Sequence, residues 1–186
     1  ALVVFQPELR SALARLGRSR MFRVFSRFED SAVVDEVLRA VEQLARSRTG
    51  AIIAIEGEVA LDEFATTGSN VDARVTAEML STIFTPRSPL HDGGVIIKGD
   101  HIVVAGAIFP LTQYSLPDKS LGTRHRAAIG LSEETDAVVI VVSEETSRVS
   151  VARRGHLDRD VNTERLREIL TVTRPGVGIA EPAPAL

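Results

Sequence analysis

The chain has no cysteine among its 186 residues. Without thiols it cannot form disulfide bonds, an iron–sulfur cluster or a zinc site built from cysteines, and it cannot use a thiolate nucleophile. Any metal ion that it binds must therefore be held by histidine, by carboxylates or by oxygen atoms of a substrate.

An excess of basic residues and a long apolar run are also missing. The formal net charge is −3, which argues against a general nucleic-acid binder, so we expect no nucleic-acid partner. No apolar run approaches the roughly 20 residues that span a bilayer, and no signal peptide with a cleavage site is visible. With 44% hydrophobic and 25% charged residues, the sequence predicts a single folded domain.

The beginning of the sequence differs from the remainder. It opens on apolar residues 1–5 without an initiator methionine, and six arginines with no Asp or Glu follow between Arg10 and Arg27. Such a cluster is typical of the cytoplasmic flank of a transmembrane segment, although a solvated amphipathic helix explains it equally well. We expect a juxtamembrane helix and connector at 1–28 of a membrane-tethered protein, the folded domain at 29–172, and a flexible tail at 173–186.

Helical and strand patterns alternate along the chain. Helical spacing predicts a first helix over residues 7–17, followed by a connector at 21–28, and a second helix that begins at Asp30 or Ser31 and ends near residue 50. Further helices are predicted over residues 71–83, from about residue 121, and over residues 164–170. Short apolar runs predict strands at 51–55, 95–97, 102–109, 137–142 and 148–152. The last four runs pair into two hairpins, which indicates an α/β fold: a single domain with a central mixed parallel/antiparallel sheet flanked by helices.

The loop before the second strand carries the first candidate site. His91 and Asp92 precede Gly93 and Gly94, and glycines let a ligand approach the main chain closely. Asp92 could therefore act on a bound ligand. An Asp-Gly turn is the simpler interpretation of this loop taken alone.

A second candidate is the segment from Gly122 to Arg126 (Gly-Thr-Arg-His-Arg), at the expected start of a helix. A helix N-terminus and guanidinium groups both bind phosphate. Arg124 and Arg126 are two residues apart and do not share a helix face, so we expect only one of them to meet a given phosphate. A solvated helix start is the alternative.

The third candidate is Ser143-Glu144-Glu145-Thr146, which follows a buried strand. One of its carboxylates could hold a hard cation such as Mg²⁺ or Mn²⁺, and an acidic hairpin turn is the alternative. Neither a Walker-type Gly-Lys-Ser/Thr loop nor a Gly-x-Gly-x-x-Gly motif occurs, so the common nucleotide-binding motifs do not explain the chain.

Taken together, residues 89–97, 121–130 and 141–146 resemble the diadenylate cyclase family in order and spacing. The resemblance runs from about Phe5 to Leu170, and residues 5–10 look like the join after the membrane helices of a CdaA-type, membrane-associated cyclase. The usual Asp-Gly-Ala of the family is Asp92-Gly93-Gly94 here. The resemblance implies a diadenylate cyclase (DAC/DisA-N-like) fold for residues 29–172, without the transmembrane helices.

The resemblance also implies an activity. Two ATP molecules would be condensed into cyclic di-AMP, a second messenger, with release of two pyrophosphates and with Mn²⁺, Mg²⁺ or Co²⁺ as cofactor. The product has two-fold symmetry, so a face-to-face homodimer would hold one ATP in each half-site. Further implied partners are a membrane regulator and phosphoglucosamine mutase, at the cytoplasmic face of the bacterial membrane.

Roles for single residues follow from the same resemblance. Catalytic roles would belong to Asp92, Gly93, Thr123, Arg124, His125 and Arg126. The ATP-binding residues would be Gly94, Ile108, Phe109, Gly122, Thr123, Arg124, Ser143 and Glu144. The metal ligands would be Glu145, His91 and Asp92.

Two other interpretations belong to different functional classes. One is a module that senses adenine nucleotides without chemistry, although all three motifs are complete. The other is an interaction module that uses the arginines between Arg10 and Arg27 on anionic lipid or nucleic acid.

Overall fold

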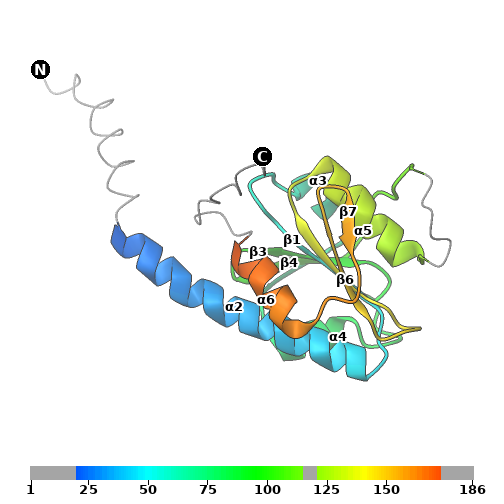
Figure 1. Ribbon diagram of the computed structural model, residues 1–186, viewed down its shortest axis with the longest axis horizontal. Coiled ribbons are helices and arrows are strands. Elements are labelled where there is room, and N and C mark those ends of the chain that lie inside the picture. The colour runs from blue at the N-terminus through cyan, green and yellow to red at the C-terminus, as the bar shows by residue number, and fades with distance from the viewer. Residues whose placement is uncertain (1–19, 115–120, 173–186) are drawn as a thin grey trace, which may run out of the picture.

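A seven-stranded sheet forms the centre of the domain (Figure 1). The computed structural model describes residues 20–114 and 121–172, with side chains from residue 31 onward. The strand order is β2-β4-β3-β1-β5-β6-β7; β1 and β3 are parallel, and all other neighbouring pairs are antiparallel. The strands are β1 (Ala51–Ile55), β2 (Ser69–Arg74), β3 (Gly94–Lys98), β4 (His101–Ala107), β5 (Val138–Val142), β6 (Val149–Arg153) and β7 (His156–Asp158). The predicted mixed sheet and both hairpins are confirmed.

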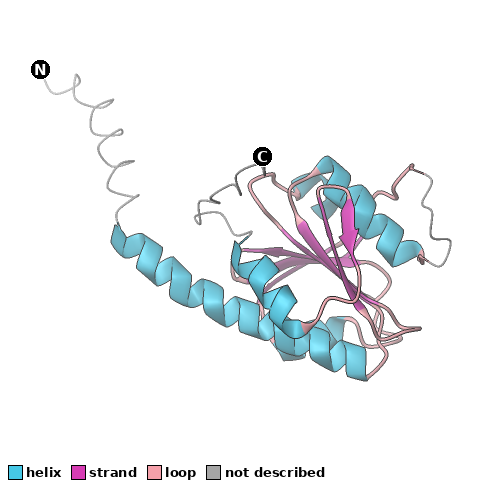
Figure 2. Cartoon of the chain, in the orientation of Figure 1, coloured by secondary structure: helices cyan, strands magenta, loops and turns pink. Residues whose placement is uncertain are grey.

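Helices cover both faces of the sheet (Figure 2). One face carries α2 (Arg20–Arg46), α4 (Ala77–Ile83) and α6 (Thr163–Val172), and the other carries α3 (Asp62–Ala65) and α5 (Thr123–Glu134). The strand β1 shows why: Ile53 and Ile55 belong to the core under α2, whereas Ile52 and Ala54 belong to the core under α5. Because successive side chains of a strand point to opposite faces, an all-apolar strand needs a cover on both sides.

The long helix α2 corrects one prediction. It runs without interruption through residues 21–28, which the sequence predicted as a connector, and past the predicted caps Asp30 and Ser31. Neither Pro nor Gly occurs between Gly17 and Gly50, so nothing in this stretch breaks a helix. Within 20–114 and 121–172, no helix has both the length and the apolar composition to span a bilayer. The predicted helix at 7–17 and the tail at 173–186 lie outside the described residues.

The predicted helix over residues 71–83 is wrong in its first half. Residues 69–74 form β2, an edge strand that pairs with β4, and α4 begins only at Ala77. Thr76 caps this helix, because its side-chain oxygen accepts a hydrogen bond from the Met79 amide at 3.1 Å. Val71 and Val75 stand four residues apart, a spacing that imitates a helix face although a strand ends between them.

Candidate active site

A cavity of about 1000 Å³ opens at one end of the central strands. The strands β1 and β3 begin at this end of the sheet, and their antiparallel neighbours β4 and β5 end there. The cavity therefore lies at the carboxyl ends of β4 and β5, as expected for ligands of such sheets, but also at the amino ends of the parallel pair. Its volume reaches the upper end of the range for small-molecule sites, roughly 300–1000 Å³.

Nearly all residues singled out in the sequence line this one cavity. The three motifs, distant in sequence, are brought together there, along with the two residues that follow β4. The lining includes His91, Asp92, Gly93, Gly94, Ile108, Phe109, Gly122, Thr123, Arg124, His125, Ser143, Glu144 and Glu145.

Arg126 is the exception, because it does not line the cavity. A helix turns by about 100° per residue, so a side chain two residues after Arg124 points to the other side of α5. The backbone of Arg126 has a structural role: its carbonyl accepts a hydrogen bond from the Thr112 amide at 3.1 Å. This bond ties α5 to the segment after β4.

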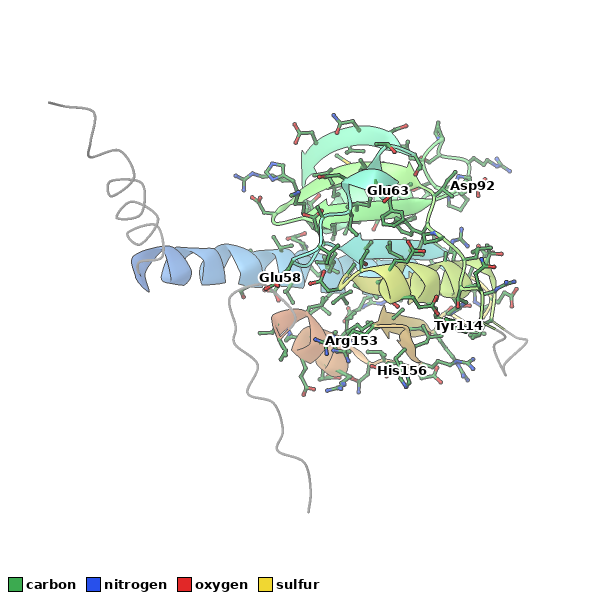
Figure 3. All side chains as sticks on the ribbon, turned by 90° about the horizontal axis from the view of Figure 1, so that it is seen from above. Glu58, Glu63, Asp92, Tyr114, Arg153 and His156 are labelled. Atoms are coloured by element: carbon green, nitrogen blue, oxygen red, sulfur yellow. The ribbon has the colours of Figure 1, made fainter. Side chains whose placement is uncertain are left out.

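The loop that carries Asp92 is held by a turn that begins at Ser88. The Ser88 carbonyl accepts hydrogen bonds from the His91 amide at 3.3 Å and from His91 Nδ1 at 2.5 Å. Because a carbonyl only accepts, Nδ1 is the donor of this hydrogen bond, and Nε2 is the other ring nitrogen of His91. Asp92 is exposed and lies at the end of the domain away from the start of α2 (Figure 3).

Another part of the cavity lining carries an ion pair. Arg124, in the first turn of α5, donates from Nη1 to Oε2 of Glu144 at 3.0 Å. A Cβ atom at Gly50 would lie 2.4 Å from that Nη1 and 2.8 Å from that Oε2, so the pair rests directly on the Gly50 main chain. We call Gly50, Arg124 and Glu144 the arginine wall.

The helix α5 adds a positive end to this wall. Its N-cap is Gly122, which provides no side-chain hydrogen bond to the first turn. The backbone amides at such an end carry partial positive charge. Together with Arg124, the helix start is suited to binding phosphate oxygens.

Other charged residues of the lining were not singled out from the sequence. They come from the turn before β1, the turn after β5 and the loop before α6, and they are Arg48, Arg148, Arg159 and Asp160. Arg148 Nη1 and Asp160 Oδ2 lie 3.1 Å apart. No sequence motif marks these positions, and only the fold brings them to the cavity.

The charges of the lining balance. It contains four arginines (48, 124, 148 and 159) and four carboxylates (Asp92, Glu144, Glu145 and Asp160), and Arg124 and Arg148 each pair with one of these carboxylates. A triphosphate brings about four negative charges, which this lining does not neutralise unaided. The balance therefore favours binding a polyphosphate together with a cation.

The predicted metal ligands do not form a complete cage in one chain. In the parts of the chain that the structure describes, no group of three or more His, Asp or Glu side chains is placed to hold a metal ion. His91, Asp92 and Glu145 line the same cavity and come from two separate loops. Their role as metal ligands stays a prediction, and carboxylates that share a cation with substrate oxygens are compatible with this lining.

The two residues after β4 differ in exposure. Ile108 is 69% exposed, whereas Phe109 is 6% exposed and packs in the core under α5. The Ile108 amide donates to Thr67 Oγ1 at 2.8 Å, which fixes the direction of the segment. Ile108 can therefore contact a ligand with most of its side chain, and Phe109 forms a wall.

Solved structures share this fold. DacA from Staphylococcus aureus, crystallised as a double mutant, is 41% identical with a TM-score of 0.76, over 78% of this chain and 97% of that chain. A protein from Bacillus cereus described as a hypothetical membrane spanning protein is 36% identical with a TM-score of 0.66, over 86% of this chain and 79% of that chain. The predicted fold class is confirmed.

Curated relatives and a family model agree with these structures. The chain is 43% identical over 172 residues to the cyclic di-AMP synthase CdaA of Bacillus subtilis and, to the same extent, to the diadenylate cyclase of Listeria monocytogenes. These matches cover 91% of this chain but only 63% of each relative. Residues 38–157 match the DAC family model, described as the DisA bacterial checkpoint controller nucleotide-binding domain. The chain therefore belongs to the DAC family.

Proposed function

We propose that the chain is a diadenylate cyclase that condenses two ATP molecules into cyclic di-AMP and two pyrophosphates. One observation carries the proposal: a single cavity collects Asp92 with its two glycines, the start of α5 with Arg124, and the acidic turn after β5. These groups supply a base, a phosphate-binding guanidinium and carboxylates for a cation. The relatives named as cyclases support the same reaction.

The reaction consists of two equivalent transfers. In each, the 3′-hydroxyl oxygen of one ATP bonds to the α-phosphorus of the other, and the bond from that phosphorus to the pyrophosphate oxygen breaks. Asp92 orients the hydroxyl and accepts its proton, while Arg124 and the start of α5 hold the phosphate oxygens. Arg124 must exchange Glu144 for phosphate when ATP binds. Because the Glu144 side chain is 60% exposed, water can solvate its carboxylate, and breaking the ion pair costs little free energy.

A divalent cation fits the donor set of the cavity. Mn²⁺, Mg²⁺ or Co²⁺ would be held by Asp92 or Glu145, with His91 Nε2 as a further ligand and with phosphate oxygens completing the shell. When bound, the cation supplies positive charge against the developing charge of the pyrophosphate. The balanced charge of the lining supports this requirement.

The symmetric product calls for two copies of the chain. We propose a face-to-face homodimer in which each copy holds one ATP, because one cavity presents only one set of these residues. Large apolar side chains are exposed beside the cavity: Ile108 and Leu111 line it, and Tyr114, 75% exposed, lies at the same end of the domain as Asp92 (Figure 3). Such residues are suited to an interface.

The test is mass spectrometry of the chain incubated with ATP, with and without Mn²⁺. We expect cyclic di-AMP and pyrophosphate only with the cation. Asp92→Asn should lower the turnover number by about 10²-fold or more, because it removes the proton acceptor, while ATP binding by calorimetry persists. The matched control is Asp62→Asn, whose side chain is 83% exposed and outside the cavity lining. A fully active Asp92→Asn variant would refute the catalytic role of Asp92.

The sensing module is the second candidate. It is supported by the same phosphate-binding groups, Arg124 and the start of α5, which bind a nucleotide whether or not it reacts. Tight binding of ATP or cyclic di-AMP without any product at high protein concentration would select it over the cyclase.

We also propose that the protein works at the cytoplasmic face of a bacterial membrane, with a membrane regulator and phosphoglucosamine mutase as partners. The resemblance of residues 5–10 to the join after membrane helices supports this location. Crosslinking in cells followed by mass spectrometry tests both partners.

A further inference from the structure

The strands β3 and β4 are paired irregularly next to Asp92. Gly94 pairs with Ala107 and Ile96 with Val104, so β3 advances by two residues where β4 advances by three. The extra residue marks a β-bulge, and Gly106 within it has a φ of +71°, in the left-handed region. Bulges of this kind bend a strand and are frequent beside active sites.

The first residues after Asp92 lie directly on this bulge. A Cβ atom at Gly93 would lie 2.5 Å from the carbonyl carbon of Gly106 and 2.8 Å from its Cα. Backbone therefore packs against backbone, with no side chain between them. The loop that precedes Asp92 also lies close, because the nearest atom to a Cβ at Gly106 would be the Leu90 carbonyl oxygen at 3.9 Å.

The next contact involves an aromatic ring. A Cβ atom at Gly94 would lie 2.1 Å from Cε2 of Phe109 and 2.5 Å from its Cζ. Phe109 is only 6% exposed and packs in the core under α5, so the ring has little room to withdraw. The ring thus fills the space that a side chain at position 94 would need. We call Gly93, Gly94, Gly106 and Phe109 the glycine wall.

We propose that Gly106 and Phe109 are positioning residues that set the place of Asp92 in the cavity. This inference rests on the proposed function for its kinetic readout. Asp92 itself is exposed, so its position depends on the main chain that follows it. That main chain is packed against the bulge and the ring, which limits movement of the carboxylate toward or away from the substrate hydroxyl. Phe109 acts through Gly94 rather than by touching the reacting atoms.

Substitutions at positions 94 and 109 test the coupling. Gly94→Ala adds one methyl group that collides with the ring, and the displaced loop should lower kcat by at least about tenfold, since a shift of about 1 Å at a reacting group can cost about 10²-fold. KM for ATP should stay within about threefold. Phe109→Leu alone should lower kcat by about three- to tenfold without raising KM, because the loop loses the ring that supports it, and the double variant should recover kcat to within about threefold of the wild type.

A role of Phe109 in holding the adenine base predicts a different result. Phe109→Leu would then raise KM, and the effects of the two substitutions would simply add. Wild-type kcat in Gly94→Ala, or additive effects in the double variant, would overturn the inference.

The bulge has a matched control in the same hairpin. Gly99 also has a positive φ, +59°, in the turn between β3 and β4, and nothing lies within 4 Å of its Cβ position. Gly106→Ala and Gly99→Ala both impose backbone strain, so they should lower the unfolding temperature similarly. Only Gly106→Ala should lower kcat, by at least about tenfold. Equal kcat in both variants would count against a positioning role of the bulge.

A structural readout separates this inference from the proposed reaction. Crystal structures of the wild type and Gly94→Ala should show the Asp92 main chain displaced in the variant, whether or not the protein makes cyclic di-AMP. If Asp92 does not move, the glycine wall does not position it. If Asp92 moves but the wild type yields no product, the proposed function fails while the positioning role stands.

Discussion

The two walls of the cavity are built by opposite means. The glycine wall has almost no side-chain atoms between its elements, and the main chain after Asp92 rests on another main chain and on a buried ring. The arginine wall consists of two charged side chains that lie on Gly50 and are partly exposed, 28% for Arg124 and 60% for Glu144. A backbone contact is rigid, whereas an exposed ion pair exchanges partners readily. The cavity thus combines a loop whose main chain is closely packed with charged side chains that can rearrange around a ligand.

The largest expected effect comes from adding a side chain to the glycine wall. Gly93→Ala places a methyl group within 2.5 Å of the Gly106 backbone, and a backbone cannot rotate away as a side chain can. We expect kcat to fall by about 10²-fold or more and the protein to lose about 1–3 kcal/mol of unfolding free energy. Turnover assays and denaturant unfolding measure both. A variant with normal kcat would show that this wall is not rigid.

A smaller effect, on binding, is expected at the arginine wall. Arg124→Ala removes a charged hydrogen-bond donor and should raise KM for ATP by about 10- to 100-fold, with unfolding changed by less than about 1 kcal/mol. Arg153→Ala is the matched control, because Arg153 pairs with Asp158 at 3.3 Å outside the cavity lining.

Glu144→Gln tests the other member of the Arg124–Glu144 ion pair. It removes the carboxylate that competes with phosphate for Arg124 and should leave the KM for ATP unchanged or lower it by a few fold. A KM more than about tenfold higher in Glu144→Gln would show instead that Glu144 binds the nucleotide or its cation directly.

The smallest effect on activity is expected far from both walls. The Ala77 amide, at the start of α4, donates to Glu36 Oε2 at 2.7 Å and lowers the pKa of Glu36 below its ordinary value of 4.5, and the hydrogen bond from Arg39 acts in the same direction. The stabilisation is therefore complete above pH 4.5 and is lost as the pH falls through the lowered pKa.

Glu36→Gln should remove this dependence without changing kcat. The variant should be less stable than the wild type at pH 7, by less than about 1 kcal/mol, and the difference should shrink below pH 4.5. Thermal unfolding between pH 3 and pH 7 measures it. A difference that grows toward low pH would contradict the assignment.

Local patterns made much of this molecule predictable. The apolar runs at β1, β3 and β5 and both hairpins follow from hydrophobic alternation and from turn residues. Two of the motifs lie where β3 begins and where β5 ends, and the other lies at the start of α5. By contrast, β2 is an edge strand without a buried residue, and its pairing with β4 is a long-range contact that no local spacing reveals. At residues 21–28 the error was of the opposite kind. A connector was predicted from the local pattern, although the helix α2 continues through this segment without interruption.

The candidate site was predictable only where a motif carried it. Asp92, Arg124 and Glu144 stand in recognisable segments, but the sequence did not show that the last two pair with each other. Arg48 and Arg159 come from turns without any pattern. The bulge at Gly106 was equally hidden, since a positive φ and a backbone contact depend on how two strands meet.

The contact between Gly94 and the Phe109 ring constrains the order in which these two positions can change over generations. A methyl group gained first at position 94 would meet the ring at 2.1 Å, whereas a smaller residue gained first at position 109 leaves only a void. A descendant sequence can therefore reach alanine at 94 more readily after the ring has been replaced. Among homologous sequences the two positions should covary, and an alanine beside a phenylalanine should be rare.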